Sequence, residues 1–177
     1  EVKNEMGNVK INKSNKGIAW GAVYWQYFEQ MDKITPNKSP LSIKKELFKE
    51  VLTSGSKKLV PIENEHLKVG DKVIVRIVLK SDRDMEYVHL KDMRAASFEP
   101  INVLSRYKYQ DGLGYYESTG DAATNFFMDR VRKGTYVFEY PLRVSIKGSY
   151  SNGISSVQCM YAPEFTANSK GLNIKVE

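Results

Sequence analysis

Regular alternation of apolar and polar residues over Thr135–Ser145 constrains the fold of this chain more than any other feature. Successive side chains of a β-strand point to opposite faces, so apolar residues at every second position predict a strand with one buried face. A helix, with its period of about 3.6 residues, would scatter the same side chains around its whole circumference. The apolar residues at every second position are Tyr136, Phe138, Tyr140, Leu142, Val144 and Ile146.

A second stretch, Val73–Leu79, alternates in the same way, and a sheet must join two such distant strands. Pro141 has no N–H to donate to a ladder, so the longer strand is predicted to be an edge or a bulge there. Gln110-Asp111-Gly112 is a strong hairpin signal, because Asp-Gly tolerates the positive φ angles of tight turns. Together with further short strands between Gly, Asp, Asn and Ser turns, this predicts an all-β fold: an antiparallel, immunoglobulin-like β-sandwich with little helix.

Three further segments complete the pattern. Leu41–Leu52 fits a helical stripe, and it also fits a strand into which Lys45 and Lys49 intrude. Gly148–Gly153 is predicted to be a hairpin loop. Ile18–Gln30 is apolar at both odd and even positions, which predicts a central strand covered on both faces or packed against a neighbouring domain.

Two prolines within residues 34–40 mark a linker or crossing loop. We therefore divide the chain into residues 1–33, an entering segment with that central strand, and residues 34–177, a β-sandwich domain. The entering segment is either the end of a preceding domain or part of the sandwich.

Composition excludes several classes of function. No apolar run approaches the ~20 residues of a membrane helix, so no direct membrane insertion is expected. The charge of +6 is concentrated in residues 1–60, where 11 basic residues face 6 acidic ones, mostly as single lysines. A nucleic-acid site would be denser and would carry a reading element, so no nucleic-acid partner is expected.

Residues for catalysis are scarce. The chain has two histidines, His66 and His89, and one cysteine, Cys159. A Cys159–His89 pair is conceivable, but a lone cysteine within a strand is usually a small buried hydrophobe. Asp82, Asp84 and Glu86 alternate and suggest either a calcium site or a solvated hairpin tip. We predict no catalytic, cofactor-binding or metal-binding residues.

Aromatic residues gather around the predicted hairpin. They form either a sugar-stacking platform, together with Trp20 and Trp25, or a cross-strand cluster packed inside the sheet. The candidate interaction aromatics are Tyr107, Tyr109, Tyr115 and Tyr116.

Several short segments, in their order and spacing, resemble the C-terminal macroglobulin-type β-sandwich of bacterial alpha-2-macroglobulins. The resemblance covers roughly residues 40–177 and favours a strand for Leu41–Leu52. The tyrosine-rich insert Tyr107–Tyr116 is similar to versions found in Bacteroidetes-like bacteria. The matching segments are Val69–Val73, Asp82–Asp92, Phe98–Pro100, Gly134–Tyr140 with Arg143 and Gly148, and Met160–Glu164.

This resemblance implies part of an endopeptidase inhibitor that traps proteases in the cell envelope, either in the periplasm or as a lipoprotein-anchored surface protein. The implied partners are thioester-type and macroglobulin-type domains of the same chain, with target proteases meeting the whole inhibitor. The thioester signature C-x-E-Q is absent, since Met160, Tyr161 and Ala162 follow Cys159. The resemblance assigns Met160 and Tyr161 to a cover that shields a thioester from water; ordinary strand residues are the other interpretation.

The sequence thus predicts a noncatalytic module of a protease trap that packs against, and shields, a thioester domain. The alternative is a carbohydrate-binding β-sandwich that uses surface Tyr and Trp residues. An adhesin or fimbrial subunit that assembles by strand addition is a third option.

Overall fold

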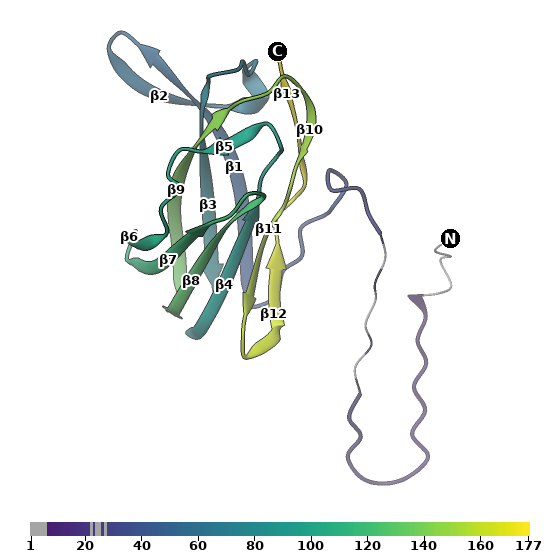
Figure 1. The fold of residues 1–177 in the computed structure, drawn as a ribbon. Helices are drawn as coiled ribbons and strands as arrows, with labels where there is room; N and C mark the ends of the chain where they lie inside the picture. Colours follow the sequence, from purple (N-terminus) through teal and green to yellow (C-terminus); the bar gives the residue numbers. More distant parts are fainter. Residues whose placement is uncertain (1–6, 22, 24–25, 27) are drawn as a thin grey trace.

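The protein folds as a sandwich of two antiparallel sheets with a separate two-stranded ribbon (Figure 1). The computed structural model describes residues 7–21, 23, 26 and 28–177. The five-stranded sheet contains, in spatial order, β2 (Ser56–Pro61), β1 (Leu41–Thr53), β3 (Lys72–Ser81), β9 (Gly134–Val144) and β5 (Phe98–Pro100). The sandwich includes one 3-10 turn, η2 (Ile62–Asn64). The all-β, immunoglobulin-like prediction is confirmed.

The six-stranded sheet covers the other side of the core. Its strands, in spatial order, are β12 (Ala162–Asn168), β11 (Ser155–Cys159), β4 (Met85–Met93), β8 (Ala123–Val131), β7 (Leu113–Thr119) and β6 (Arg106–Gln110). The ribbon pairs β10 (Gly148–Asn152) with β13 (Leu172–Val176).

The segment Leu41–Leu52 is a strand, as the family resemblance indicated. Strand β1 pairs with β3 in a register that sets Ile43 opposite Leu79 and Leu47 opposite Val75. This register aligns the apolar side chains of both strands on the core face, which a helix at this position could not do.

Strand β9 lacks a second strand partner before Leu142, so the edge predicted at Pro141 is found N-terminal to it, and at Pro141 itself the Ile101 N–H donates to the carbonyl at 3.5 Å. Its pairing with β3 extends from Gly134 to Arg143, whereas β5 pairs with it only over Leu142–Val144. The missing N–H of Pro141 therefore costs no ladder bond to β5.

Aromatic side chains from both sheets meet in the core. The ring centroids of Phe126 on β8 and Phe138 on β9 lie 5.1 Å apart at an interplanar angle of 61°. Tyr115 on β7 packs against both rings, at 5.6 Å and 5.3 Å. Aromatic pairs of this kind contribute about 0.5–1.5 kcal/mol each beyond burial of area, so this cluster helps to hold the two sheets together.

A buried ion pair also joins the sheets. Lys45 Nζ on β1 lies 2.7 Å from Asp92 Oδ1 on β4, and the side chains are 1% and 0% exposed. The ammonium also donates to the carbonyls of Met93 and Gly153, at 2.6 and 3.1 Å. Ser155 and Tyr140 donate their hydroxyls to the Asp92 carboxylate.

One sequence-based prediction was wrong, and another falls partly outside the described residues. Of the strand predicted for Ile18–Gln30, Ala22, Tyr24, Trp25 and Tyr27 lie outside the described residues; the described residues of this stretch form no strand, and Trp20 is 92% exposed. A strand with two apolar faces needs neighbours on both sides, and the chain instead continues through residues 31–37 along β12 and β13. The predicted loop Gly148–Gly153 contains β10, because its polar, turn-like residues find a partner in β13.

Candidate functional site

The turn between β11 and β12 carries two large apolar side chains where turns usually carry small or polar ones. Cys159 pairs with Ala162, which leaves Met160 and Tyr161 at the tip. Met160 is 57% exposed and Tyr161 is 81% exposed. Contiguous exposed apolar groups of this kind typically mark a contact with another surface.

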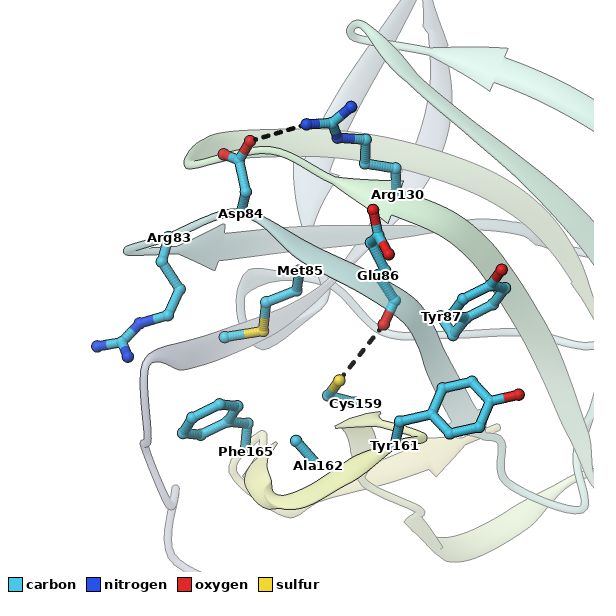
Figure 2. Close-up of a pocket in the computed structure, with 10 residues that line it drawn as sticks. All are labelled: Arg83, Asp84, Met85, Glu86, Tyr87, Arg130, Cys159, Tyr161, Ala162 and Phe165. Carbon is cyan, nitrogen blue, oxygen red and sulfur yellow. Dashed lines mark hydrogen bonds and ion pairs between the residues drawn. The ribbon is translucent and has the colours of Figure 1, made fainter.

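The start of β4 supports this turn (Figure 2). The backbone N–H of Met160 donates to the carbonyl of Tyr87 over 2.9 Å. The rings of Tyr87 and Tyr161 meet edge to face, with centroids 5.1 Å apart and an interplanar angle of 80°. We call Tyr87, Met160 and Tyr161 the aromatic corner.

An open hollow of about 420 Å³ lies beside the aromatic corner, between the start of β4 and the β11–β12 hairpin. Its apolar lining includes Met85, Cys159, Ala162 and Phe165, and its charged lining includes Arg83 and Arg130 (Figure 2). An apolar centre with a charged rim is the usual composition of a protein–protein contact.

Both arginines at the rim are held in ion pairs with aspartates. Asp84 accepts hydrogen bonds from the backbone N–H of Lys133 at 2.8 Å and from Arg130 at 3.3 Å. These contacts, the backbone bond first, lower the pKa of the Asp84 carboxyl. Arg83 donates to Asp82 at 2.8 Å and lies over the ring of Phe165. The aspartates considered for calcium are thus engaged by cations and a backbone N–H.

Cys159 and His89 do not form a catalytic pair. Cys159 is buried and its Sγ contacts the carbonyl oxygen of Glu86 at 3.3 Å, as a donor would. His89 pairs with Gln158 rather than Cys159, stacks on Phe127 at 4.7 Å and contacts Asn125 Oδ1 at 3.0 Å. Within the described residues, no three His, Cys, Asp or Glu side chains cluster as metal ligands do.

The four candidate tyrosines do not form one surface platform. Tyr115 is 2% exposed and belongs to the core, so its assignment as an interaction aromatic was wrong. Strand alternation directs its neighbour Tyr116 outward, where it packs against Tyr107 with centroids 5.0 Å apart. Tyr107 and Tyr109 are exposed. Sequence reasoning missed Tyr87, because nothing in the Glu86-Tyr87-Val88 pattern signals that its φ angle is positive, at +54°.

Comparison with known proteins defines the class. The fold is that of a macroglobulin-type domain, and a family model described as the bacterial alpha-2-macroglobulin MG10 domain matches residues 41–164. Because this match covers more than half of the sequence, the chain belongs to that family.

Solved structures agree with the family match. An alpha-2-macroglobulin from Salmonella reacted with methylamine has 20% identity and a TM-score of 0.61, over 81% of this chain and 10% of that chain. Trypsin-activated alpha-2-macroglobulin from Escherichia coli has 17% identity and a TM-score of 0.63, over 81% and 11%. A native Escherichia coli form from domain MG7 to the C-terminus has 17% identity and a TM-score of 0.62, over 80% and 24%.

This chain therefore spans between about a tenth and a quarter of each related structure. A curated relative, circularly permutated Ras protein 2 of Dictyostelium discoideum, is 22% identical over 108 residues, which are 61% of this chain and 3% of that protein. The described part of the chain contains no helix long and apolar enough to cross a membrane.

Proposed function

We propose that this chain is a noncatalytic module of a bacterial alpha-2-macroglobulin-like endopeptidase inhibitor. In this role it packs against thioester-type and macroglobulin-type domains of the same polypeptide, and proteases meet the assembled inhibitor. Family membership supports the proposal, and Cys159 and His89, the pair considered for catalysis, have other partners.

The observation that carries the proposal is the exposed pair Met160 and Tyr161 beside an apolar hollow. Burying apolar surface contributes about 25 cal/mol per Å², so a neighbouring domain gains free energy by covering this corner. An isolated sandwich leaves this apolar surface in water and does not gain that free energy.

The finer proposal is that Met160 and Tyr161 shield a thioester in that neighbour. A thioester persists only where water cannot reach its carbonyl carbon, so the required chemistry is apolar cover rather than a reactive group. Both residues lie in a short turn between two strands and their side chains are largely exposed, which suits insertion over a reactive bond.

The division of the chain is part of the proposal. Residues 1–33 form an entering segment that leads from a preceding domain and meets the sandwich at Met31 and Asp32, and residues 34–177 form the macroglobulin-type module. Solvent exposure of Ile18, Trp20 and Phe28 supports this, because alternating aromatic and aliphatic residues gain stability only against a second sheet. The complete protein is expected in the periplasm or on a lipoprotein anchor, which fractionation of cells that express it would test.

Trapping is tested with the complete protein and an endopeptidase. A trap blocks cleavage of a large protein substrate but leaves cleavage of a small peptide substrate intact, because the captured active site stays open to small molecules. Equal inhibition of both substrates, or inhibition by residues 34–177 alone, would contradict the trap model. Turnover that depends on Cys159 would contradict the noncatalytic assignment.

Shielding is tested by thiol release. If the complete protein holds a thioester, Met160→Ala and Tyr161→Ala should speed its hydrolysis, measured as free thiol over time without protease. The exposed Tyr109→Ala variant is the matched control, since Tyr109 lies on β6, away from the aromatic corner. Unchanged thiol release in both corner variants would remove the shielding role and leave the interdomain contact.

A further inference from the structure

Tyr87 has a backbone conformation that strands rarely contain. Its φ is +54°, in the left-handed region that glycine favours, although it lies inside β4 and carries a bulky ring. The other described non-glycine residues with positive φ, Ser54 and Asp111, lie in tight hairpin turns where such angles are required. A strained residue within a strand is retained when the surroundings, or a function, require it.

The strain coincides with a break in alternation in two paired strands. On β4, Met85 and Val88 are buried while Glu86 and Tyr87 between them are both exposed. On β8, Met128 and Val131 are buried while Asp129 and Arg130 are both exposed. The register is the same on both sides of the break, with Glu86 opposite Arg130 and Val88 opposite Met128, while Tyr87 and Asp129 between them do not pair. Both strands therefore turn two successive side chains outward without inserting a residue.

The outward direction of the Tyr87 side chain creates the aromatic corner. Continued alternation from Met85 would direct Tyr87 towards the core, where it could not meet Tyr161. In the observed conformation its ring packs edge to face on Tyr161, and its carbonyl accepts the Met160 N–H. One residue thus holds both members of the exposed pair, and its own ring remains 49% exposed beside them.

We infer that Tyr87 is a positioning residue for Met160 and Tyr161, and the third apolar side chain of the surface that a neighbouring domain of the same polypeptide covers. This inference rests on the proposed interdomain contact. The part of the neighbouring domain that makes this contact is apolar, because the aromatic corner adjoins the hollow lined by Met85, Cys159 and Phe165. Two of the cations around that hollow are paired, Arg83 with Asp82 and Arg130 with Asp84.

The test is oxidation of Met160 by dilute peroxide, followed by mass spectrometry in the complete protein and in the isolated chain. Methionine oxidation follows exposure, so Met160 should react freely in the isolated chain and slowly in the complete protein. Buried Met128 is the internal reference. Tyr87→Gly removes the ring and relieves the backbone, and Tyr87→Phe keeps the ring.

In the complete protein, Tyr87→Gly should raise Met160 oxidation by about threefold or more, and Tyr87→Phe should leave it unchanged. The isolated chain should show no difference between variants. Its midpoint of thermal unfolding should fall by less than about 2 °C in Tyr87→Gly, since relief of strain offsets the lost ring contact. Ser54→Gly, which relieves a positive φ in a distant turn, is the control.

The outcomes separate the two proposals. If Met160 is equally reactive in the complete protein and the isolated chain, the interdomain contact itself is wrong. If Met160 is protected to the same extent in the unsubstituted protein, in Tyr87→Phe and in Tyr87→Gly, the contact stands and the positioning role is overturned. A large fall in the unfolding midpoint of the isolated Tyr87→Gly chain would make Tyr87 a stabilising residue only.

Discussion

At the scale of single residues, a lysine occupies a core position of β1. Leu41, Ile43 and Leu47 face the core on alternate positions, and Lys45 completes the series. Its ammonium is stable there because Asp92 neutralises its charge and two backbone carbonyls accept hydrogen bonds from its other N–H groups. The sequence pattern marked Lys45 as an intrusion, whereas the structure makes it a polar bridge between the sheets.

Breaking this bridge should destabilise the protein strongly. Lys45→Met leaves the Asp92 carboxylate buried without its cation, which typically costs about 3–5 kcal/mol of unfolding free energy. Lys44→Met is the matched control, because Lys44 is exposed and its partner Glu46 is only half-buried, and such surface pairs contribute about 0–1 kcal/mol. Denaturant unfolding of both variants gives the comparison; equal losses would contradict the bridging role.

Tyr115 gives a second prediction at this scale. Its buried hydroxyl has no hydrogen-bond partner among the described residues, so Tyr115→Phe should raise the free energy of unfolding by about 1 kcal/mol. Tyr109→Phe, whose ring is exposed, should leave the free energy unchanged. Denaturant unfolding at neutral pH measures both effects. A fall in stability for Tyr115→Phe would show that the hydroxyl has a partner.

Alkaline pH should destabilise the protein through the same residue. Burial first, then the Glu117 charge, raises the pKa of Tyr115 to about 12, and burial raises the pKa of Tyr140. The unfolded chain releases these protons near pH ~10, so above that pH it binds fewer protons than the native state. Stability is therefore complete below about pH 10 and declines as the pH rises towards about 12. The free energy of unfolding, measured by denaturant at a series of pH values, should therefore fall less steeply with pH for Tyr115→Phe than for the unsubstituted protein.

At the scale of elements, the β6–β7 hairpin protects the open edge of β9. The hairpin predicted from Gln110-Asp111-Gly112 is confirmed, with positive φ at both Asp111 and Gly112. Gln110 bonds the backbone N–H and carbonyl of Glu139 at 3.0 and 3.3 Å, and Asp111 accepts the N–H of Val137 at 2.7 Å. These side chains satisfy groups that would otherwise attract another strand.

Removing these side chains should open the edge. In Gln110→Ala/Asp111→Gly, the amides of Val137 and Glu139 should exchange with solvent roughly tenfold faster or more, and glycine preserves the turn. The amide of Ile77 in the central strand β3 is the control. Sedimentation should detect association that increases with concentration. Unchanged exchange at both edge amides would assign protection of β9 to another part of the fold.

At the scale of the whole molecule, the sandwich begins before its first strand. Gly171 N–H donates to the Ile34 carbonyl, and Asn173 donates to Asp32. A side chain on Gly171 would overlap the Met31 carbonyl oxygen at 1.9 Å. Residues 31–34 therefore pack on the sandwich, close to the boundary inferred from the sequence, while Trp20 and Phe28 contribute no buried surface.

A chain that begins at Met31 should fold as stably as the longer chain. Its midpoint of thermal unfolding should lie within about 2 °C of that of residues 1–177, because no described apolar side chain before Met31 is buried. A chain that begins at Leu41 loses the contacts of Asp32 and Ile34 and should unfold at lower temperature. Substantial destabilisation of the Met31 chain would place the entering segment within the sandwich.

Prediction from sequence succeeded where apolar residues alternated over a long stretch, and it failed where contacts with other strands decided the local structure. The eleven-residue alternation of β9 could belong only to a strand, but Leu41–Leu52 satisfied two periods until β3 supplied a partner. The exposed pair Met160–Tyr161 was selected by family resemblance, and its position at a turn became visible only in the structure. The sequence alone does not show which of the adjacent Tyr115 and Tyr116 is buried. The register of β7 decides this.

The sequence by itself determined the class of fold, since alternating apolar residues bury one face only as strands and Asp-Gly turns reverse the chain locally. Tertiary structure alone decided which polar residues are buried, because Lys45 and Asp92 lie in different strands and become stable only when the sheets meet. It also decided the backbone of Tyr87: a left-handed tyrosine is unfavourable locally and persists only while β8, β11 and Tyr161 surround it.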